Sequence, residues 1–296
     1  MLNTLKFIFS HPLNKDRRFA ALFEWLRWQI GSRLLPGAVV SPFVNDAVLL
    51  AEPGMTGATG NVYCGLAEFE DMGFVLHFLR TDDLFVDVGA NIGSYSVLAS
   101  KTIGSESLAI EALPETYEKL MRNFRANDIL DRVEPLNCAL GDQSGEIYFT
   151  STLDTMNHAV SESDQAGGDV IAVPVSTLDQ VLAGRVPSLI KIDVEGYETP
   201  VIGGATETLA SAEQAAVIME LNGCGKRYGF SDDVLYQRMR KCGYISVSYD
   251  PFSRELCLLE QANRKGNTIF VKHSLLEGVR ERLKSASCFH VKGHSL

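Results

Sequence analysis

The chain has 296 residues, of which 46% are hydrophobic and 22% are charged, a composition typical of a globular protein. Its formal net charge is −10, and most of the acidic residues lie in the middle of the chain. An acidic body repels nucleic acid, and the sequence has no run of about 18 apolar residues, so we predict neither a nucleic-acid partner nor a transmembrane helix.

The six cysteines show neither a CxxC pair nor zinc-ligand spacing. This pattern favours a reducing compartment over a disulfide framework. The apolar start of the chain, residues 1–10, is too short and poorly flanked for a signal peptide. We therefore expect a cytoplasmic protein.

Residues 1–80 are predicted to form a partly helical N-terminal extension. Apolar residues recur there at helical spacing, among arginines and two tryptophans: Phe19, Leu22, Phe23, Leu26 and Ile30. We expect this stripe to pack on the rest of the protein. An interfacial helix in peripheral contact with a membrane is the alternative.

From Leu84 onward, short apolar runs alternate with amphipathic stretches, which is typical of βα units and a parallel sheet. The predicted strands are 84–88, 107–112, 133–138, 188–193, 215–221, 244–249 and 267–272. The predicted helices are 94–102, 114–127, 177–183, 199–210 and 231–241. We expect an α/β domain over residues 81–273, with a seven-stranded, mostly parallel Rossmann-like sheet and helices on both faces. A basic tail, 274–296, follows it.

The first predicted strand ends in Asp87 and leads through Gly89 and Gly93 into a helix. A glycine turn of this kind can hold a nucleotide-like ligand, because neither glycine carries a Cβ. A pyrophosphate is disfavoured beside Asp87, whereas the ammonium and sulfonium of S-adenosylmethionine suit a carboxylate. An NAD-dependent oxidoreductase remains open as an alternative.

Acidic residues follow several predicted strands and should meet at one edge of the sheet, where ligands of such folds bind: Asp87, Glu111, Asp193, Glu195 and Glu220. Glu111 is placed to accept hydrogen bonds from ribose hydroxyls; its alternative role is that of an acid at a helix N-terminus. Asp142, after the third strand, either accepts from an adenine amino group or belongs to a plain turn.

The sequence resembles the FkbM family of S-adenosylmethionine-dependent methyltransferases. The segments that carry the resemblance are 85–93, 110–114, 139–142, 175–179, 190–198, 203–205 and Glu220. The chain departs from the family where Ala112 and Leu113 separate Glu111 from Pro114. The resemblance implies a class I methyltransferase that methylates hydroxyl groups of sugars, glycans or natural products. The residues expected around the methionine end of the cofactor are Asp87, Gly89, Ala90, Asn91 and Gly93.

Methylation of a hydroxyl needs a group that removes its proton. Asp193, Glu195 and Glu220 are predicted either to act as the base or to hold a divalent cation such as magnesium. Alternatively, Glu195 and Glu198 are partnered by Lys191 or by backbone amides and only brace the turn after the strand. His158 lies in a polar insertion, residues 151–169, and is a further candidate base. The insertion is either a lid or a surface loop, and a non-catalytic scaffold remains a third functional class.

Overall fold

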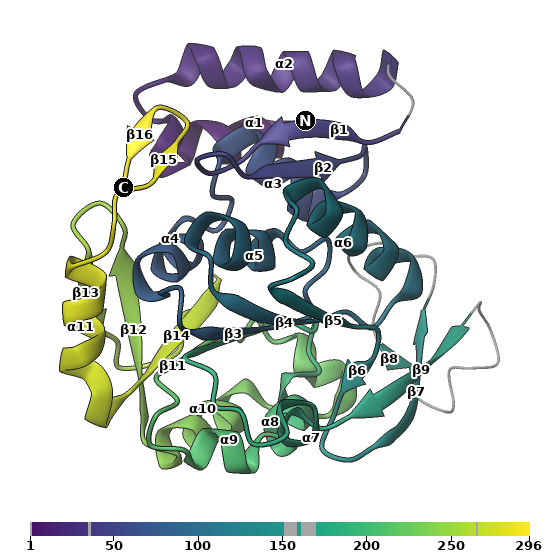
Figure 1. The fold of residues 1–296 in the computed structure, drawn as a ribbon, viewed down its shortest axis with the longest axis vertical. Helices are drawn as coiled ribbons and strands as arrows, with labels where there is room; N and C mark the ends of the chain where they lie inside the picture. Colours follow the sequence, from purple (N-terminus) through teal and green to yellow (C-terminus); the bar gives the residue numbers. More distant parts are fainter. Residues whose placement is uncertain (1, 35–36, 151–158, 161–169, 265) are drawn as a thin grey trace.

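The computed structural model describes residues 2–34, 37–150, 159–160, 170–264 and 266–296 (Figure 1). The α-helices are α1 (Leu2–Ser10), α2 (Arg18–Leu34), α3 (Thr56–Cys64), α4 (Phe69–Phe78), α5 (Ser94–Val97), α6 (Pro114–Asn127), α7 (Leu178–Leu182), α8 (Glu198–Gly203), α9 (Thr206–Ala210), α10 (Asp232–Lys241) and α11 (Leu276–Lys284). The strands are β1 (Val39–Pro42), β2 (Val48–Ala51), β3 (Leu84–Val88), β4 (Glu106–Ile110), β5 (Val133–Leu136), β6 (Ala139–Leu140), β7 (Gly145–Thr150), β8 (Ala159–Val160), β9 (Val170–Ser176), β10 (Leu189–Ile192), β11 (Ala216–Glu220), β12 (Tyr244–Asp250), β13 (Glu255–Leu258), β14 (Asn267–Lys272), β15 (His290–Val291) and β16 (His294–Ser295).

The central sheet has eight strands in the order β13-β12-β14-β11-β10-β3-β4-β5. The strands from β11 to β5 are parallel, whereas β14 is antiparallel to both β11 and β12. This confirms the predicted Rossmann-like, mostly parallel sheet. The prediction of seven strands missed β13, which pairs with β12 at the edge of the sheet. β13 is short and largely exposed, so it lacks the apolar run that marks a buried strand.

Two predicted helices differ from the structure. The helix expected over 94–102 begins as α5 and continues as a π-helical segment, Leu98–Ile103. The helix expected over 199–210 is divided into α8 and α9. The division lies at Gly204, where a Cβ would be 2.1 Å from the carbonyl oxygen of Gly141. A close approach of two chain segments therefore interrupts the helical pattern.

The sheet is covered on both faces, by α4, α5, α6 and α11 on one and by α7 to α10 on the other (Figure 1). Side chains of β3 alternate between these faces. Phe85 lies in the core beneath α4 and α5, and Val86 lies in the core on the other side. The same alternation places Asp87 and, on β10, Lys191 on the α4–α5 face.

The N-terminal extension forms a further layer outside α4, α5 and α6 (Figure 1). Amide side chains of α6 bind the main chain of β2, with Asn123 Oδ1 accepting from the amide of Leu50 at 2.7 Å. The C-terminal segment, predicted as a basic tail, forms α11 and the β15–β16 hairpin. Lys292 in that hairpin lies 2.6 Å from Glu24 of α2. The N-terminal extension and the C-terminal hairpin therefore pack against each other.

α2 packs on the protein through Leu22 of the predicted stripe, but most of the stripe faces outward. Phe19, Phe23 and Ile30 are exposed at 92%, 67% and 59%. Trp25 and Trp28 are buried instead, in a core shared with α3. Burial of the two indole rings against α3 stabilises this orientation of the helix.

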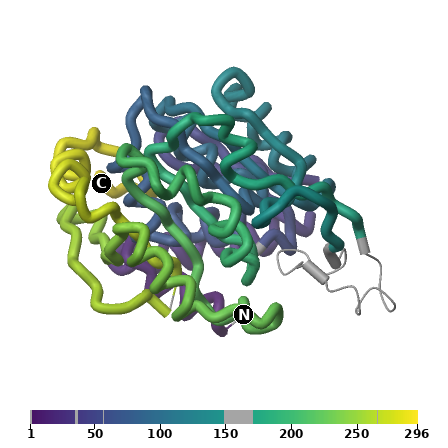
Figure 2. The backbone as a smooth tube through the Cα atoms, turned by 90° about the horizontal axis from the view of Figure 1, so that it is seen from below, coloured from purple at the N-terminus to yellow at the C-terminus, as the bar shows by residue number. Residues whose placement is uncertain are grey.

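A second, four-stranded sheet has the order β6-β9-β7-β8 and was not predicted as a sheet. Its strands extend from the side of the molecule opposite the C-terminal segment (Figure 2). Apart from β8, the insertion 151–169 lies outside the described residues, and so does His158. Across the residues placed in the structure, no helix is both long enough and apolar enough to cross a bilayer.

Candidate active site

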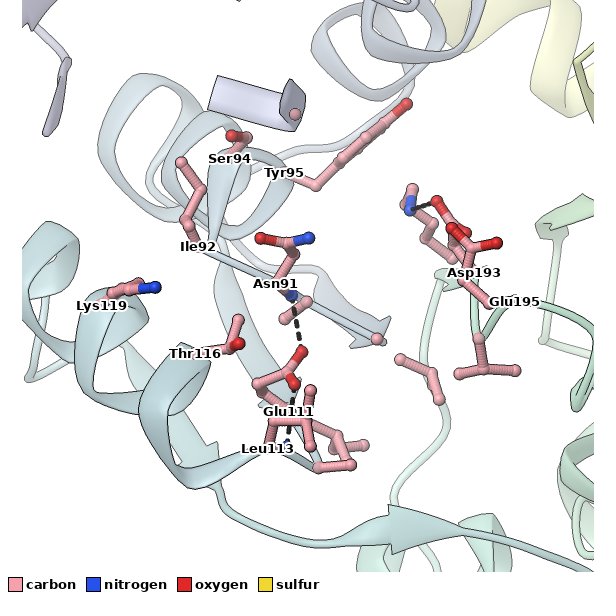
Figure 3. Close-up of a pocket in the computed structure, with 18 of the residues that line it drawn as sticks. Asn91, Ile92, Ser94, Tyr95, Glu111, Leu113, Thr116, Lys119, Asp193 and Glu195 are labelled. Atoms are coloured by element: carbon pink, nitrogen blue, oxygen red, sulfur yellow. Dashed lines mark hydrogen bonds and ion pairs between the residues drawn. The ribbon is translucent and has the colours of Figure 1, made fainter. Parts of the chain in front are cut away.

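A cavity of about 400 Å³ lies at the carboxyl ends of β3, β4 and β10 (Figure 3). Its lining includes the turn after β3, the chain after β4 and the chain after β10. The structure thus brings together, around one cavity, Gly89, Ala90, Asn91, Glu111, Asp193 and Glu195. Parallel strands present their carboxyl ends at one edge, which explains why residues so distant in sequence meet here.

The turn after β3 packs closely against other parts of the protein at both of its glycines. Gly89 and Gly93 have φ of +76° and +84°. A Cβ at Gly93 would lie 2.6 Å from the Phe124 ring, and one at Gly89 would lie 1.9 Å from the carbonyl oxygen of Asp193. Protein atoms therefore lie where a Cβ would be placed at either glycine. Gly89 lines the cavity, and Gly93 is not among the lining residues.

Asp87, at the end of β3, makes contacts that hold this turn in place, and it is not among the residues that line the cavity. Its side chain is buried, and Oδ2 accepts hydrogen bonds from the amide and hydroxyl of Ser96 at 3.1 and 2.8 Å. Burial raises its pKa, although Lys191 opposes that effect. Its other oxygen, Oδ1, has no hydrogen-bond partner among the described residues. Asp87 therefore ties the end of β3 to the start of α5.

Glu111 faces the cavity with both carboxylate oxygens oriented by the main chain. Oε2 accepts from the amide of Asn91 at 2.9 Å, and Oε1 accepts from the amide of Leu113 at 3.0 Å (Figure 3). Burial raises its pKa to about 7, and the amide hydrogen bonds limit the rise. Each oxygen keeps a lone pair for a further donor. The sequence prediction that Glu111 ends the second strand in a binding position is thus consistent with this geometry.

Three carboxylates cluster near the chain after β10, where Asp193 and Glu195 line the cavity and Glu220 is not among the lining residues. Oxygens of Asp193, Glu195 and Glu220 lie within 4.8 Å of one another. Glu195 has φ of +53°, and this left-handed conformation places it beside Asp193 on the cavity. The buried Lys191 ammonium lies 2.9 Å from Asp193 Oδ2 and 4.6 Å from the centre of the Tyr95 ring. The Lys191 ammonium therefore neutralises part of the negative charge of this acidic cluster.

Burial and repulsion by Asp193 and Glu195 raise the pKa of Glu220 to about 8. Its Oε2 is buried without a hydrogen-bond partner in the described part of the chain. Glu198 has a bracing role, because its carboxylate accepts from the amides of Val194 and Gly196 at 3.2 and 3.1 Å. Glu198 therefore braces the turn after β10 through backbone amides, as the alternative prediction proposed. Lys191 pairs with Asp193 instead of with Glu198.

The family described as "Methyltransferase FkbM domain" matches residues 87–246, more than half of the chain, and this match includes the glycine turn and all the acids above. The chain belongs to the FkbM methyltransferase family. The resemblance seen in the sequence is confirmed, and family membership does not favour the NAD-dependent alternative.

Two curated relatives of this FkbM chain are methyltransferases. Hexuronic acid methyltransferase AglP of Haloferax volcanii is 32% identical over 50% of this chain and 59% of its own length. Methyltransferase sdnD of Sordaria araneosa is 30% identical over 47% of this chain and 66% of its own length. The matched regions thus span less than two thirds of either relative. Among solved structures, P. horikoshii TYW2 in complex with MeSAdo aligns with a TM-score of 0.39 and 17% identity, over 80% of this chain and 70% of that one.

The sequence analysis missed one wall of the FkbM cavity, which the N-terminal extension supplies. The lining residues of this wall come from α3, the chain on either side of it and α4: Met55, Asn61, Glu68 and Met72. Glu68 accepts from the hydroxyl of Tyr95 at 2.7 Å, which joins this wall to α5. These residues carry no local motif. Only the packing of the extension on the sheet domain brings them to the site.

Asp142, a predicted cofactor contact, stands apart from the cavity, whereas Tyr197 in the chain after β10 lines it. Asp142 is exposed and lies beside α8, since a Cβ added at Gly203 would be 2.7 Å from the Cβ of Asp142. Asp142 is not among the residues that line the cavity. Tyr197 lines the cavity and also packs edge-on against Tyr228, with ring centres 5.5 Å apart. His158 lies outside the described residues.

Proposed function

We propose that this chain transfers a methyl group from S-adenosylmethionine to a hydroxyl group of a sugar, glycan or natural product. The observation that carries the proposal is that Glu111, the turn residues Gly89–Asn91 and the Asp193–Glu195 pair all line one cavity. Membership of the FkbM family supports methyl transfer. The relative named hexuronic acid methyltransferase supports a carbohydrate acceptor.

The residues of the cavity fit S-adenosylmethionine in size and charge. The volume of about 400 Å³ lies within the range of small-molecule sites. Four acidic residues line the cavity against two lysines: Glu68, Glu111, Asp193, Glu195, Lys119 and Lys191. A cofactor that carries an ammonium and a sulfonium is attracted by such a lining, whereas the pyrophosphate of a dinucleotide is repelled.

We assign the cofactor end of the cavity to Glu111 and the glycine turn. Glu111 would accept hydrogen bonds from the ribose hydroxyls through the lone pairs that the amides leave open. The main chain of Gly89–Asn91 would lie against the methionine end. Asp87 would act indirectly, by holding the turn and by adding negative charge beneath it.

We assign the acceptor end to the acidic cluster. The bound cofactor would supply an electrophilic methyl group on a sulfonium centre. Asp193 and Glu195 would orient the acceptor hydroxyl and take its proton as the oxygen gains the methyl group. Lys191 fixes Asp193 through its ammonium. Glu220 would hold a proton at neutral pH because its pKa is raised, and would thereby reduce the repulsion within the cluster.

The same charges favour a neutral acceptor. A carboxylate on the acceptor would lie near Glu68, Asp193 and Glu195, while the ammonium of Lys191 is already paired with Asp193. Repulsion between like charges at short range costs binding energy in a partly buried site. We therefore propose a neutral, polyhydroxylated acceptor for this chain, in contrast to the hexuronic acid in the name of its relative.

Isothermal titration with S-adenosylhomocysteine, the demethylated cofactor, tests the proposal first. We expect micromolar affinity, with at least about a tenfold loss in Glu111→Ala because two charge-assisted hydrogen bonds disappear. A folded protein that binds NADH and not S-adenosylhomocysteine would overturn the proposal. A folded protein that binds neither NADH nor S-adenosylhomocysteine would favour the alternative of a non-catalytic scaffold.

A further inference from the structure

The outward face of α2 carries a continuous stripe of large apolar side chains. Five residues spaced three or four apart are exposed at 92%, 67%, 42%, 59% and 76%: Phe19, Phe23, Leu26, Ile30 and Leu34. This spacing places them on one side of the helix, opposite the buried Trp25 and Trp28. α2 lies along the outer edge of the molecule, with α1 and β1 on its inner side (Figure 1). A stripe of this length indicates an interaction surface.

Exposed arginines border the stripe. Arg27 and Arg33 lie on its two sides by helical position, and Arg18 lies at its N-terminal end. The one acid of α2, Glu24, is partly buried and lies 2.6 Å from the Lys292 ammonium. This face is therefore apolar at its centre and positive at its borders, on a chain whose formal net charge is −10.

The charge pattern distinguishes between two occupants of the stripe. A second copy of the chain would bring Arg27 and Arg33 near the same residues of its partner, and α2 has no exposed acid to pair with them. A bilayer with anionic lipids offers acyl chains to the apolar centre and negative head groups to the arginines. We propose that α2 docks the protein on the surface of an anionic membrane, with its axis in the plane of the interface.

Docking through α2 would bring the cavity close to the bilayer. α3 shares a core with α2, and Gln29 of α2 donates to the hydroxyl of Tyr63 in α3 at 3.0 Å. α3 also supplies Gly57 and Asn61 to the cavity lining. The cavity is thus separated from the docking face by about one layer of helix. This proposal rests on the surface of α2 and is independent of the proposed reaction.

Vesicle co-sedimentation of the whole chain tests the proposal. We expect binding to phosphatidylcholine vesicles that contain phosphatidylglycerol, weak binding to phosphatidylcholine alone, and loss of binding at about 1 M salt. The double variant Phe23→Ser, Ile30→Ser should bind at least about tenfold more weakly because it loses apolar surface. Arg27→Gln with Arg33→Gln should lose about tenfold or more.

α10 offers matched controls, because it lies on the opposite side of the molecule from α2 (Figure 1). Val234→Ser removes a side chain that is 68% exposed, and Arg240→Gln with Lys241→Gln removes two exposed charges. These variants should bind vesicles as the unmodified chain does. Circular dichroism and affinity for S-adenosylhomocysteine should be unchanged in every variant, since each altered side chain is exposed and distant from the cavity.

Three results would overturn the proposal. The unmodified chain could bind both kinds of vesicle equally weakly. The α2 variants could bind as tightly as the α10 controls. Sedimentation velocity could instead show a dimer that dissociates in Phe23→Ser, Ile30→Ser without any vesicle binding, which would assign the stripe to a second copy of the chain.

Discussion

Gly89 lies directly against the main chain of Asp193: a Cβ at residue 89 would be 1.9 Å from the Asp193 carbonyl oxygen. The amide of Asp193 also donates to the carbonyl of Val88 at 3.0 Å. The glycine turn and the chain after β10 therefore form one packed unit. The position of the proposed proton acceptor depends on the absence of a side chain at residue 89.

Replacement of Gly89 by alanine should destabilise the fold strongly. The new Cβ meets main-chain atoms that cannot rotate away, and φ of +76° is itself unfavourable for alanine. We expect the free energy of unfolding to fall by about 3 kcal/mol or more, measured by urea denaturation. Gly184→Ala is the matched control, because Gly184 has φ of +86° with nothing within 4 Å of the added Cβ. It should cost only about 1 kcal/mol; equal losses in the two variants would contradict the packing argument.

Affinity for S-adenosylhomocysteine should rise with pH through neutrality. The pKa of Glu111 is raised to about 7, so its carboxyl is mostly protonated at pH 6 and mostly ionised at pH 8. Ribose hydroxyls donate to the ionised form, and affinity should therefore be about tenfold weaker at pH 6 than at pH 8.

Titration calorimetry across this range, repeated with Glu111→Gln, checks the pH dependence. The variant should bind more weakly at pH 8 and should show little change with pH. Glu198, whose pKa is also about 7, and Glu220, whose pKa is about 8, stay in place in this variant. A variant that keeps the full pH dependence would assign it to one of those groups instead.

Asp193→Asn should separate binding from turnover. An amide fills the same space but cannot take the proton of the acceptor hydroxyl, so kcat should fall by about 100-fold or more. Affinity for S-adenosylhomocysteine should change by less than about threefold, since Glu111 and the turn are intact. Turnover is followed as S-adenosylhomocysteine released with a neutral sugar acceptor found by screening.

Asp131→Asn, which changes an exposed acid between α6 and β5, is the control for loss of charge and should retain full kcat. Near-normal turnover in Asp193→Asn would remove this residue from the mechanism. Glu195→Gln would then be the next variant, because Glu195 lines the same end of the cavity.

Removal of divalent cations should leave turnover unchanged. Lys191 supplies a cation 2.9 Å from Asp193, and the raised pKa of Glu220 keeps a proton on that carboxyl at neutral pH, so the cluster is partly neutralised by the protein itself. Dialysis against EDTA followed by the methyl-transfer assay checks this. A loss of activity that added magnesium restores would show that the three carboxylates hold a cation instead.

Much of the sheet domain was predictable because its signals are local. A buried parallel strand is a continuous apolar run, as in 84–88, and the predicted and observed bounds of β3 agree. α6 begins at Pro114, as predicted, because proline fits the first turn of a helix. The acids after β4 and β10 were expected at one edge of the sheet, and the structure places Glu111, Asp193 and Glu195 on one cavity there.

The failures share a physical cause, which is that burial depends on distant parts of the chain. The periodicity of α2 identified a helix, but the aromatic core with α3 determined that Trp25 and Trp28 face inward and the predicted stripe faces outward. The packing of the glycine turn likewise depends on distant residues, because the Asp193 carbonyl and the Phe124 ring lie where Cβ atoms at Gly89 and Gly93 would be placed.

The sequence by itself determined most strands and helices of the main sheet, the family and the acids at the strand ends, because each depends on residues close together in the chain. Only the tertiary structure decided that Glu68 and Asn61 of the extension line the cavity and that α2 presents an apolar face outward. Those features arise where segments far apart in sequence compete to bury apolar surface and to balance charge. No local pattern specifies the outcome of that competition.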